Sequence, residues 1–306
     1  MDHKLRFFLN QLHDRYHRPG FLSSDPLEFV HRYSDPWDQE VVAILSALLA
    51  YGKVKQIRRS VEETLGRIEK LAATPALFIR GLGDPASCAR AGREFKTFTH
   101  RFNRGSDLMI LFGLIHRSWK EYGSVGGHFL TYLDQDDVGI ETALNRLMSC
   151  WRGWVKGRVR AKSGSFDYLL TSPEDGSCCK RWCMLIRWMG RRDDLDPGLW
   201  AAGSALSHTF PPGRILRADQ LVIPLDTHTG RISQYLGLTQ RKSLGWKAAL
   251  EVTDALRECN SGDPVRYDFA LSRLGILDLC QRKYRREICE KCDLFSVCRL
   301  AQAAPT

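Results

Sequence analysis

Apolar residues recur at helical spacing along most of the chain. Four long segments show this spacing clearly, at residues 38–52, 53–72, 107–123 and 138–154. The first of them begins with acidic residues and ends at Gly52, which are typical signals of the two ends of a helix. No stretch combines the alternation of a half-buried strand with hairpin turns. The pattern therefore predicts an all-α protein.

Two further features of the pattern concern location and domain organisation. The longest apolar run, residues 41–51, is too short to span a bilayer, so we expect a core helix there. The N-terminal residues carry scattered charges and lack the apolar stretch of a signal peptide. We therefore expect a cytoplasmic, nucleoid-associated monomer with no membrane partner. Residues 191–221 are rich in turn-forming residues, which indicates a crossing between two domains.

The positive charge of the chain is concentrated in two clusters. The net charge is +10. Residues 152–162 carry five basic residues and no acid, with Trp151 and Trp154 close by, and residues 281–286 carry four more around Tyr284. Basic groups neutralise phosphates and aromatic rings stack on bases, so nucleic acid is the expected partner. Each cluster alone also fits a solvated basic loop, and an acidic membrane surface would suit the same charge.

Four of the ten cysteines lie together near the C-terminus. Cys280, Cys289, Cys292 and Cys298 are separated by eight, two and five residues. Thiolates are soft ligands, which excludes calcium and magnesium and leaves a tetrahedral zinc or an iron–sulfur cluster. A single Cys-x-x-Cys unit with long gaps on both sides favours iron–sulfur, and zinc stays open. Four buried cysteines without any metal are the remaining alternative.

Three features, in the same order along the chain, resemble endonuclease III and its relatives, the helix-hairpin-helix DNA glycosylases. "SPEDGSCCKRW" at residues 172–182 is similar to the hairpin that carries the family's lysine. "LDTH" at residues 225–228 is similar to the family's Val-Asp-Thr-His segment, and the cysteine spacing resembles its cluster loop with a longer first gap. "KRWCMLIRWMGRRDDLDPGLW" and "IPLDTH" resemble a bacterial branch of this superfamily, whose substrate the resemblance does not supply.

The resemblance implies a fold and a cofactor. It implies two helical domains with a cleft between them: a helical-barrel domain at residues 36–190, and a cluster-bearing domain formed by residues 1–35 and 222–306. Residues 191–221 would then be an inter-domain insertion. It also implies that the four cysteines hold a mainly structural 4Fe-4S cluster, in a basic loop that contacts double-stranded DNA.

The resemblance also implies roles for individual residues. Lys180 and Asp226 would be the catalytic pair, facing each other across the cleft. Gly176 matches the first hairpin glycine, and Cys178 replaces the second. Leu48 stands where the family has a glutamine that fills the gap left by a flipped base, so it is either a wedge or a core residue. The residues expected to contact DNA are Gly176, Arg181, Arg187, Arg282, Lys283, Arg285 and Arg286.

Both groups of the expected pair suit cleavage of an N-glycosidic bond. A carboxylate stabilises the oxocarbenium-like sugar, and a deprotonated amine can attack the same carbon and form a Schiff base. Other interpretations exist for each residue. Asp226 is equally well placed as a helix N-cap, with Gly237 just after the helix, and lysines in basic helices are usually solvated. A helix over residues 177–190 would turn Lys180, Met184 and Arg187 toward the cleft or solvent.

The leading hypothesis is therefore a DNA repair glycosylase that removes a damaged or mismatched base, with AP lyase chemistry. One alternative is a non-catalytic iron–sulfur protein that binds DNA. Another is a zinc-stabilised protein that binds or processes RNA.

Overall fold

Helices make up most of the protein, and this confirms the predicted fold class. The computed structural model describes residues 3–156, 164–281 and 283–303. Each of the four predicted long helices is present, with its ends shifted by a few residues. The α-helices are α1 (His3–Tyr16), α2 (Pro36–Leu48), α3 (Val54–Glu69), α4 (Pro75–Gly81), α5 (Pro85–Phe95), α6 (Gly105–Tyr122), α7 (Val125–Thr131), α8 (Glu141–Val155), α9 (Lys180–Gly190), α10 (Thr227–Tyr235), α11 (Trp246–Arg257), α12 (Asp268–Ile276), α13 (Arg286–Cys289) and α14 (Arg299–Gln302).

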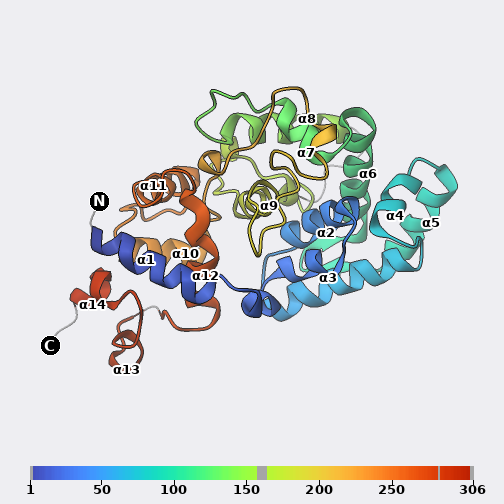
Figure 1. The fold of residues 1–306 in the computed structure, drawn as a ribbon. Helices are drawn as coiled ribbons and strands as arrows, with labels where there is room; N and C mark the ends of the chain where they lie inside the picture. Colours follow the sequence, from blue (N-terminus) through green and yellow to red (C-terminus); the bar gives the residue numbers. More distant parts are fainter. Residues whose placement is uncertain (1–2, 157–163, 282, 304–306) are drawn as a thin grey trace.

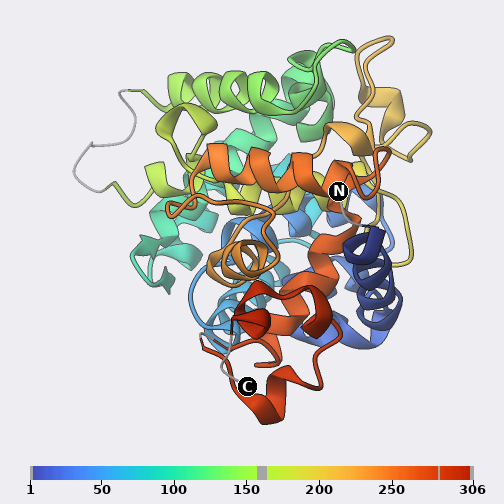
Figure 2. The same cartoon turned by 90° about the vertical axis from the view of Figure 1, so that its left-hand side faces the viewer.

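The two ends of the chain lie together at one end of the molecule (Figure 1). Helix α1 packs on α12, and α10 packs on α12 as well. We call α1 and α10–α14 the terminal lobe. Helices α2–α8 lie at the opposite end in Figure 1, and we call them the central lobe. Figure 2 shows α1 beside the C-terminal segments from a second direction.

Helix α9 lies between the two lobes and is almost entirely buried (Figure 1). It packs against α2 of the central lobe. The N-terminal segment is divided between the lobes, because the 3-10 helix η2 (Pro26–Arg32) packs on α2 while α1 lies with α12. A boundary within the first 35 residues therefore falls between α1 and η2.

Residues 191–221 are held on the central lobe by a buried carboxylate. Glu40 of α2 is fully buried, and it accepts hydrogen bonds from the indole nitrogens of Trp119 and Trp200, each at 2.7 Å. The backbone N–H of Gly126 donates to the same side chain at 3.0 Å. Burial raises the pKa of Glu40, and the hydrogen bonds from these neutral donors oppose that shift only in part. The same segment also contacts the terminal lobe, because Asp193 binds His17 and Arg191 binds Asp263. It therefore touches both lobes.

A short β-hairpin interrupts the helical pattern, and the sequence did not predict it. Strands β1 (Thr99–His100) and β2 (Asn103–Arg104) pair antiparallel around a two-residue turn. Arg101 lies in this turn with a φ of 55°. The side-chain amide of Asn103 donates to the carbonyl of Ser165 at 2.7 Å, which ties the hairpin to the segment before α9.

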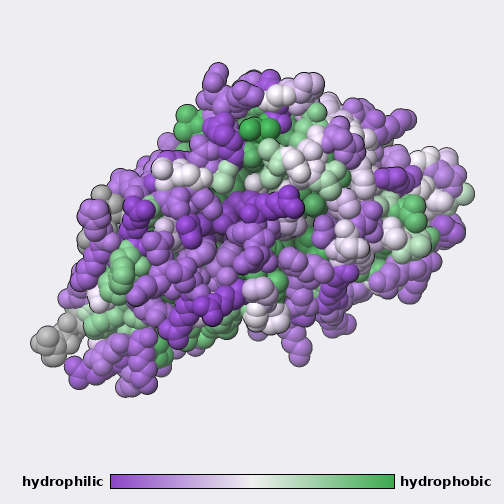
Figure 3. Space-filling view, viewed as in Figure 1, coloured by the Kyte–Doolittle hydropathy of each residue, from purple (hydrophilic) through white to green (hydrophobic). Residues whose placement is uncertain are grey.

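The face of the protein that is turned to the viewer in Figure 1 is mainly polar. Figure 3 shows hydrophilic side chains over most of one face, with small hydrophobic areas between them. Among the helices that the structure describes, none is both long and apolar enough to cross a membrane.

Candidate active site

Lys180 and Asp226 lie next to each other between the two lobes. The Nζ atom of Lys180 is 3.9 Å from Oδ2 of Asp226, and the two side chains are 30% and 29% exposed. Both line a cavity of about 790 Å³. Its other walls come from Ser24 to Pro26, the segment after α2, the start of α10 and helix α12. The fold therefore brings together two residues that the sequence places far apart.

Asp226 combines two roles through its two carboxylate oxygens. Its Oδ1 atom accepts hydrogen bonds from the backbone N–H groups of His228 and Thr229, both at 2.8 Å. Asp226 is therefore the N-cap of α10, as predicted. Gly237 follows the helix with a φ of 73°, which confirms its predicted position. Because Oδ1 alone makes the cap, Oδ2 is left to face Lys180.

Lys180 is the first residue of α9, and the turn before it fixes its position. Gly176 has a left-handed φ of 72° and Cys179 one of 48°. Cys178, which stands in place of a hairpin glycine, donates its Sγ–H to the carbonyl of Leu225 at 3.2 Å. This bond joins the lysine-bearing turn to the residue just before Asp226. From residue 164 to the turn, the described chain forms two short 3-10 helices, at Asp167–Leu170 and Pro173–Asp175, where a helix-hairpin-helix would have a full helix.

The cavity contains a third carboxylate that the sequence analysis did not identify. Asp268 begins α12, lines the cavity and is buried, and its Oδ2 atom lies 2.7 Å from Arg187. Burial raises the pKa of Asp268 to about 6; the charge of Arg187 opposes this shift and that of Asp226 adds to it. No motif surrounds Asp268 in the sequence. Its place in the cavity follows from the packing of α12 against α10, which the sequence alone does not indicate.

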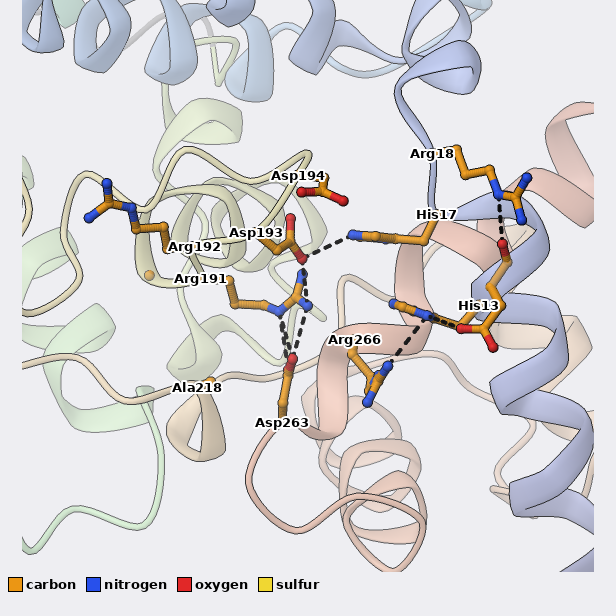
Figure 4. A pocket seen from close by; sticks show the side chains of 12 residues that line it. His13, His17, Arg18, Arg191, Arg192, Asp193, Asp194, Ala218, Asp263 and Arg266 are labelled. Carbon is orange, nitrogen blue, oxygen red and sulfur yellow. Dashed lines mark hydrogen bonds and ion pairs between the residues drawn. The ribbon is translucent and has the colours of Figure 1, made fainter.

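Ion pairs continue from Arg187 to a second pocket. Arg187 also contacts Asp196 at 3.2 Å, and Asp196 in turn binds Arg191. Arg191 lines a pocket of about 610 Å³ between α1 and the segment after α9 (Figure 4). There it contacts Asp263 and Asp193, each at 2.9 Å, and His17 contacts Asp193 at 2.9 Å. Burial acts to raise the pKa of Asp193, but the bond to His17 and the charge of Arg191 outweigh it and lower that pKa.

Three predicted site residues serve the core instead of a surface. Arg181 is buried, and its guanidinium donates to the carbonyl oxygens of Leu48 and Tyr168. Arg187 is 2% exposed and is paired with Asp268 and Asp196. The expectation that these two arginines contact DNA is corrected, because both side chains are buried within the protein. Leu48 is completely buried at the end of α2, so it is a core residue and not a wedge.

The comparisons with known proteins identify a family. Residues 25–277 match a family described as a protein of unknown function, DUF2400. The chain belongs to the DUF2400 family. No curated protein and no solved structure matches it significantly. The part that matches DUF2400 contains Lys180, Asp226 and Asp268, and it ends before Cys280.

The four C-terminal cysteines form a neighbourhood just beyond the DUF2400 match. All four are half-buried. Burial raises the pKa of Cys280 to about 11, and the charges of Cys292, Cys298 and Cys289 add to this shift. The backbone N–H of Arg285 lies 3.4 Å from Sγ of Cys289 and donates to it. Four thiols as a donor set fit a zinc ion or an iron–sulfur cluster, since both prefer thiolate ligands. In the described part of the chain, no three or more His, Cys, Asp or Glu side chains lie close enough together to hold a metal ion.

The basic residues of the cysteine loop lie on the surface. Lys283, Arg285 and Arg286 are exposed, and Arg286 contacts Glu290 at 3.2 Å. Arg282 lies outside the described residues, and so does the part of the other basic cluster at 157–162. Of the predicted DNA contacts, these three side chains and the open turn at Gly176 are therefore exposed to a partner.

Proposed function

We propose that the protein is a DNA glycosylase with AP lyase activity and that its active site is the cavity between the lobes. The observation that carries this proposal is the 3.9 Å approach of Lys180 Nζ to Asp226 Oδ2 in a partly open cavity. Its volume of about 790 Å³ lies within the usual range for pockets that bind small molecules, and a single nucleotide is of that size. A nucleotide within double-stranded DNA must be flipped out of the helix to enter it.

In the proposed reaction, the neutral amine of Lys180 attacks C1′ of the deoxyribose. The C1′–N bond breaks, and the base leaves with the electron pair and takes up a proton. Asp226 stabilises the positive charge that develops on the sugar during this step. Loss of a proton from the nitrogen and opening of the sugar ring then give a Schiff base on Lys180. Removal of a C2′ proton expels the 3′ phosphate, and water finally releases the lysine.

The neighbours of the pair support these roles by position. Asp226 is held by two backbone N–H groups at 2.8 Å, which fixes the direction of its second oxygen. Asp268 lies beside the pair, and burial raises its pKa to about 6, which suits a group that accepts a proton near neutral pH. We propose that a 4Fe-4S cluster on the four cysteines shapes the loop that presents Lys283, Arg285 and Arg286 to phosphates. That cluster supplies structure, and no chemical step depends on it.

Trapping of the Schiff base tests the proposal. Borohydride reduction in the presence of duplex DNA that carries damaged, mismatched or abasic nucleotides should give a covalent complex. Lys180→Ala should abolish the complex. Lys120→Ala is the control, because Lys120 is an exposed lysine on α6 that does not line the cavity, and this variant should still be trapped. If no substrate in the panel gives a complex, or if Lys180→Ala is trapped as well as the unchanged protein, the proposal fails.

A second function, non-catalytic DNA binding, is favoured by one observation. Among the described residues between 164 and Lys180 there are two short 3-10 helices in place of a full helix, and Cys178 stands in place of a glycine. This function predicts salt-sensitive DNA binding that persists in Lys180→Ala, with no strand cleavage by either protein. Metal analysis separates both functions from a zinc-stabilised RNA-binding protein. Iron with broad visible absorption supports the first two, and zinc in a colourless protein supports the third.

A further inference from the structure

Three aromatic side chains meet at one edge of the proposed active-site cavity. Tyr51 and Tyr168 line the cavity, and Phe102 lies in the turn of the β-hairpin beside them. The ring centroids of Phe102 and Tyr168 are 4.9 Å apart, and that of Tyr51 is 5.3 and 5.0 Å from them. Phe102 is 46% exposed and Tyr168 is 38% exposed. We call these three residues the aromatic rim.

The buried residue Arg181 and a hydrogen bond to strand β1 hold the aromatic rim in place. The guanidinium of Arg181 lies 4.0 Å from the ring centroid of Tyr168 and 5.2 Å from that of Tyr51. Arg181 is itself anchored, because it donates to the carbonyl of Leu48 at 2.9 Å. The hydroxyl of Tyr51 donates to the carbonyl of His100 in strand β1 at 3.1 Å. Exposed aromatic rings that are held this firmly lose little entropy when a second flat group stacks on them.

The charges around the aromatic rim suit a polyanion. Lys53 and Arg101 are exposed at this edge, and Arg101 lies 6.0 Å from the ring centroid of Tyr51. Lys55, in the first turn of α3, is also exposed. Asp167, the residue before Tyr168 in the chain, is an exposed acid. A mixture of flat rings and an excess of cations is the combination with which proteins bind unpaired nucleotides.

We propose that the aromatic rim stacks an unpaired nucleobase, so that the protein prefers nucleic acid in which one nucleotide is already unpaired. This inference rests on the proposed function, since it places the base at the mouth of the same cavity. Stacking on the rim would hold the nucleotide outside the duplex while its sugar reaches Lys180 and Asp226. Leu48 is buried and takes no part in this, and the hairpin provides the contact instead.

A thermodynamic cycle tests the inference without any chemistry. In the Lys180→Ala protein, fluorescence anisotropy gives the affinity for a duplex with a one-nucleotide bulge. The same measurement is made on a duplex whose bulged nucleotide lacks its base. The two ligands have the same backbone, so the ratio of their affinities reports the base alone. We expect the base to strengthen binding about tenfold, and we expect Phe102→Ala or Tyr168→Ala to bring the ratio close to one.

Two further variants separate stacking from other effects. Phe7→Ala removes an aromatic ring that is 57% exposed on α1, outside the cavity, and it should leave the ratio unchanged. Phe102→Leu keeps apolar bulk in the turn without a ring, and it should lose most of the ratio. A ratio near one in the starting protein, or one that Phe102→Ala and Tyr168→Ala do not change, overturns the inference.

The trapping experiment and this cycle can overturn the two proposals separately. If the ratio depends on the aromatic rim but no Schiff base is trapped, the rim binds nucleotides and the proposed function falls. If a complex is trapped but the ratio is one, the chemistry stands and the rim has no role. If the protein binds neither ligand, both proposals are wrong.

Discussion

Two helices of this protein begin with an aspartate in nearly the same geometry, yet only one of these aspartates lies in a cavity. Oδ1 of Asp35 accepts the backbone N–H groups of Trp37 and Asp38 at the start of α2, at 2.8 and 3.2 Å. Oδ1 of Asp226 accepts two N–H groups at the start of α10, both at 2.8 Å. Asp35 is exposed on the surface, whereas Asp226 meets Lys180 between the lobes. Capping is thus the same at both sites, and the second oxygen differs in its surroundings.

The comparison shows what a cap can contribute to a site. A capping carboxylate is rigid because two backbone donors fix one of its oxygens, and this leaves the other oxygen aimed in one direction. At Asp35 that direction is solvent, so the rigidity has only a structural use. At Asp226 it is a cavity with an amine 3.9 Å away. The fold, and not the local sequence, places Asp226 next to an amine with which it could act on a substrate.

The largest expected effect is a loss of base-removal activity when Asp226, but not Asp35, is replaced by asparagine. Asp226→Asn keeps an oxygen for the cap, since asparagine caps about as well as aspartate, but it removes the negative charge that faces the sugar. We expect the rate of base removal in single-turnover reactions to fall about 10³-fold. Asp35→Asn is the matched control, with a change of less than about twofold. Equal activity in the two variants would show that Asp226 is only a cap.

This part of the site was predictable from sequence because its signals are local. A capping aspartate with a glycine after the helix indicates the bounds of α10 at any position in a fold. Likewise, the spacing along residues 177–190 placed Lys180, Met184 and Arg187 on one face, and all three line the cavity. The helical class followed from the same periodicity.

The remainder depends on contacts between distant segments. Arg181 and Arg187 give the sequence of α9 the basic character of a DNA-binding helix. Because both lobes cover α9, however, Arg181 binds a backbone carbonyl and Arg187 binds a carboxylate in the protein interior. Asp268 enters the site because α12 packs on α10. The hairpin with Phe102 has strands of two residues, which are too short to show any alternation. Such features cannot be found without tertiary structure.

The second-largest expected effect is a loss of stability when the buried ion pairs near Asp226 are broken. Arg187→Leu leaves the buried carboxylates of Asp268 and Asp196 without their cation. We expect the free energy of unfolding, measured by urea titration, to fall by about 3–5 kcal/mol. Arg241→Leu breaks an exposed, solvent-screened pair with Glu251 and should lower the free energy of unfolding far less. A loss at Arg187 as small as that at Arg241 would mean that the buried pairs do not hold the cavity together.

The third effect is a pH dependence that links Asp226 to its buried neighbour. The pKa of Asp268 is raised to about 6, so the folded state holds this proton more tightly than the unfolded state. Its contribution to stability is therefore complete below about pH 4 and is lost as the pH rises to about 6. Relative to Asp268→Asn, the unfolding free energy of the unchanged protein should fall by up to about 3 kcal/mol across this window. Urea titrations at several pH values measure the difference.

The same titrations show whether Asp226 contributes to that window. The charge of Asp226 adds to the rise in the pKa of Asp268, so the fall should be smaller when both proteins also carry Asp226→Asn. A fall of unchanged size would mean that Asp268 does not sense Asp226.

The smallest effect compares the two caps as caps. Alanine has no oxygen to accept the N–H groups, so Asp35→Ala and Asp226→Ala should each lower the unfolding free energy by about 1 kcal/mol. The ion pair of Asp226 with Lys180 is partly exposed and should add only a few tenths of a kcal/mol. Urea titration of both variants therefore gives nearly equal losses, although only Asp226→Ala should abolish base removal. A stability loss at Asp226 that far exceeds the loss at Asp35 would contradict the equivalence of the caps, because its second oxygen would then stabilise the fold as well.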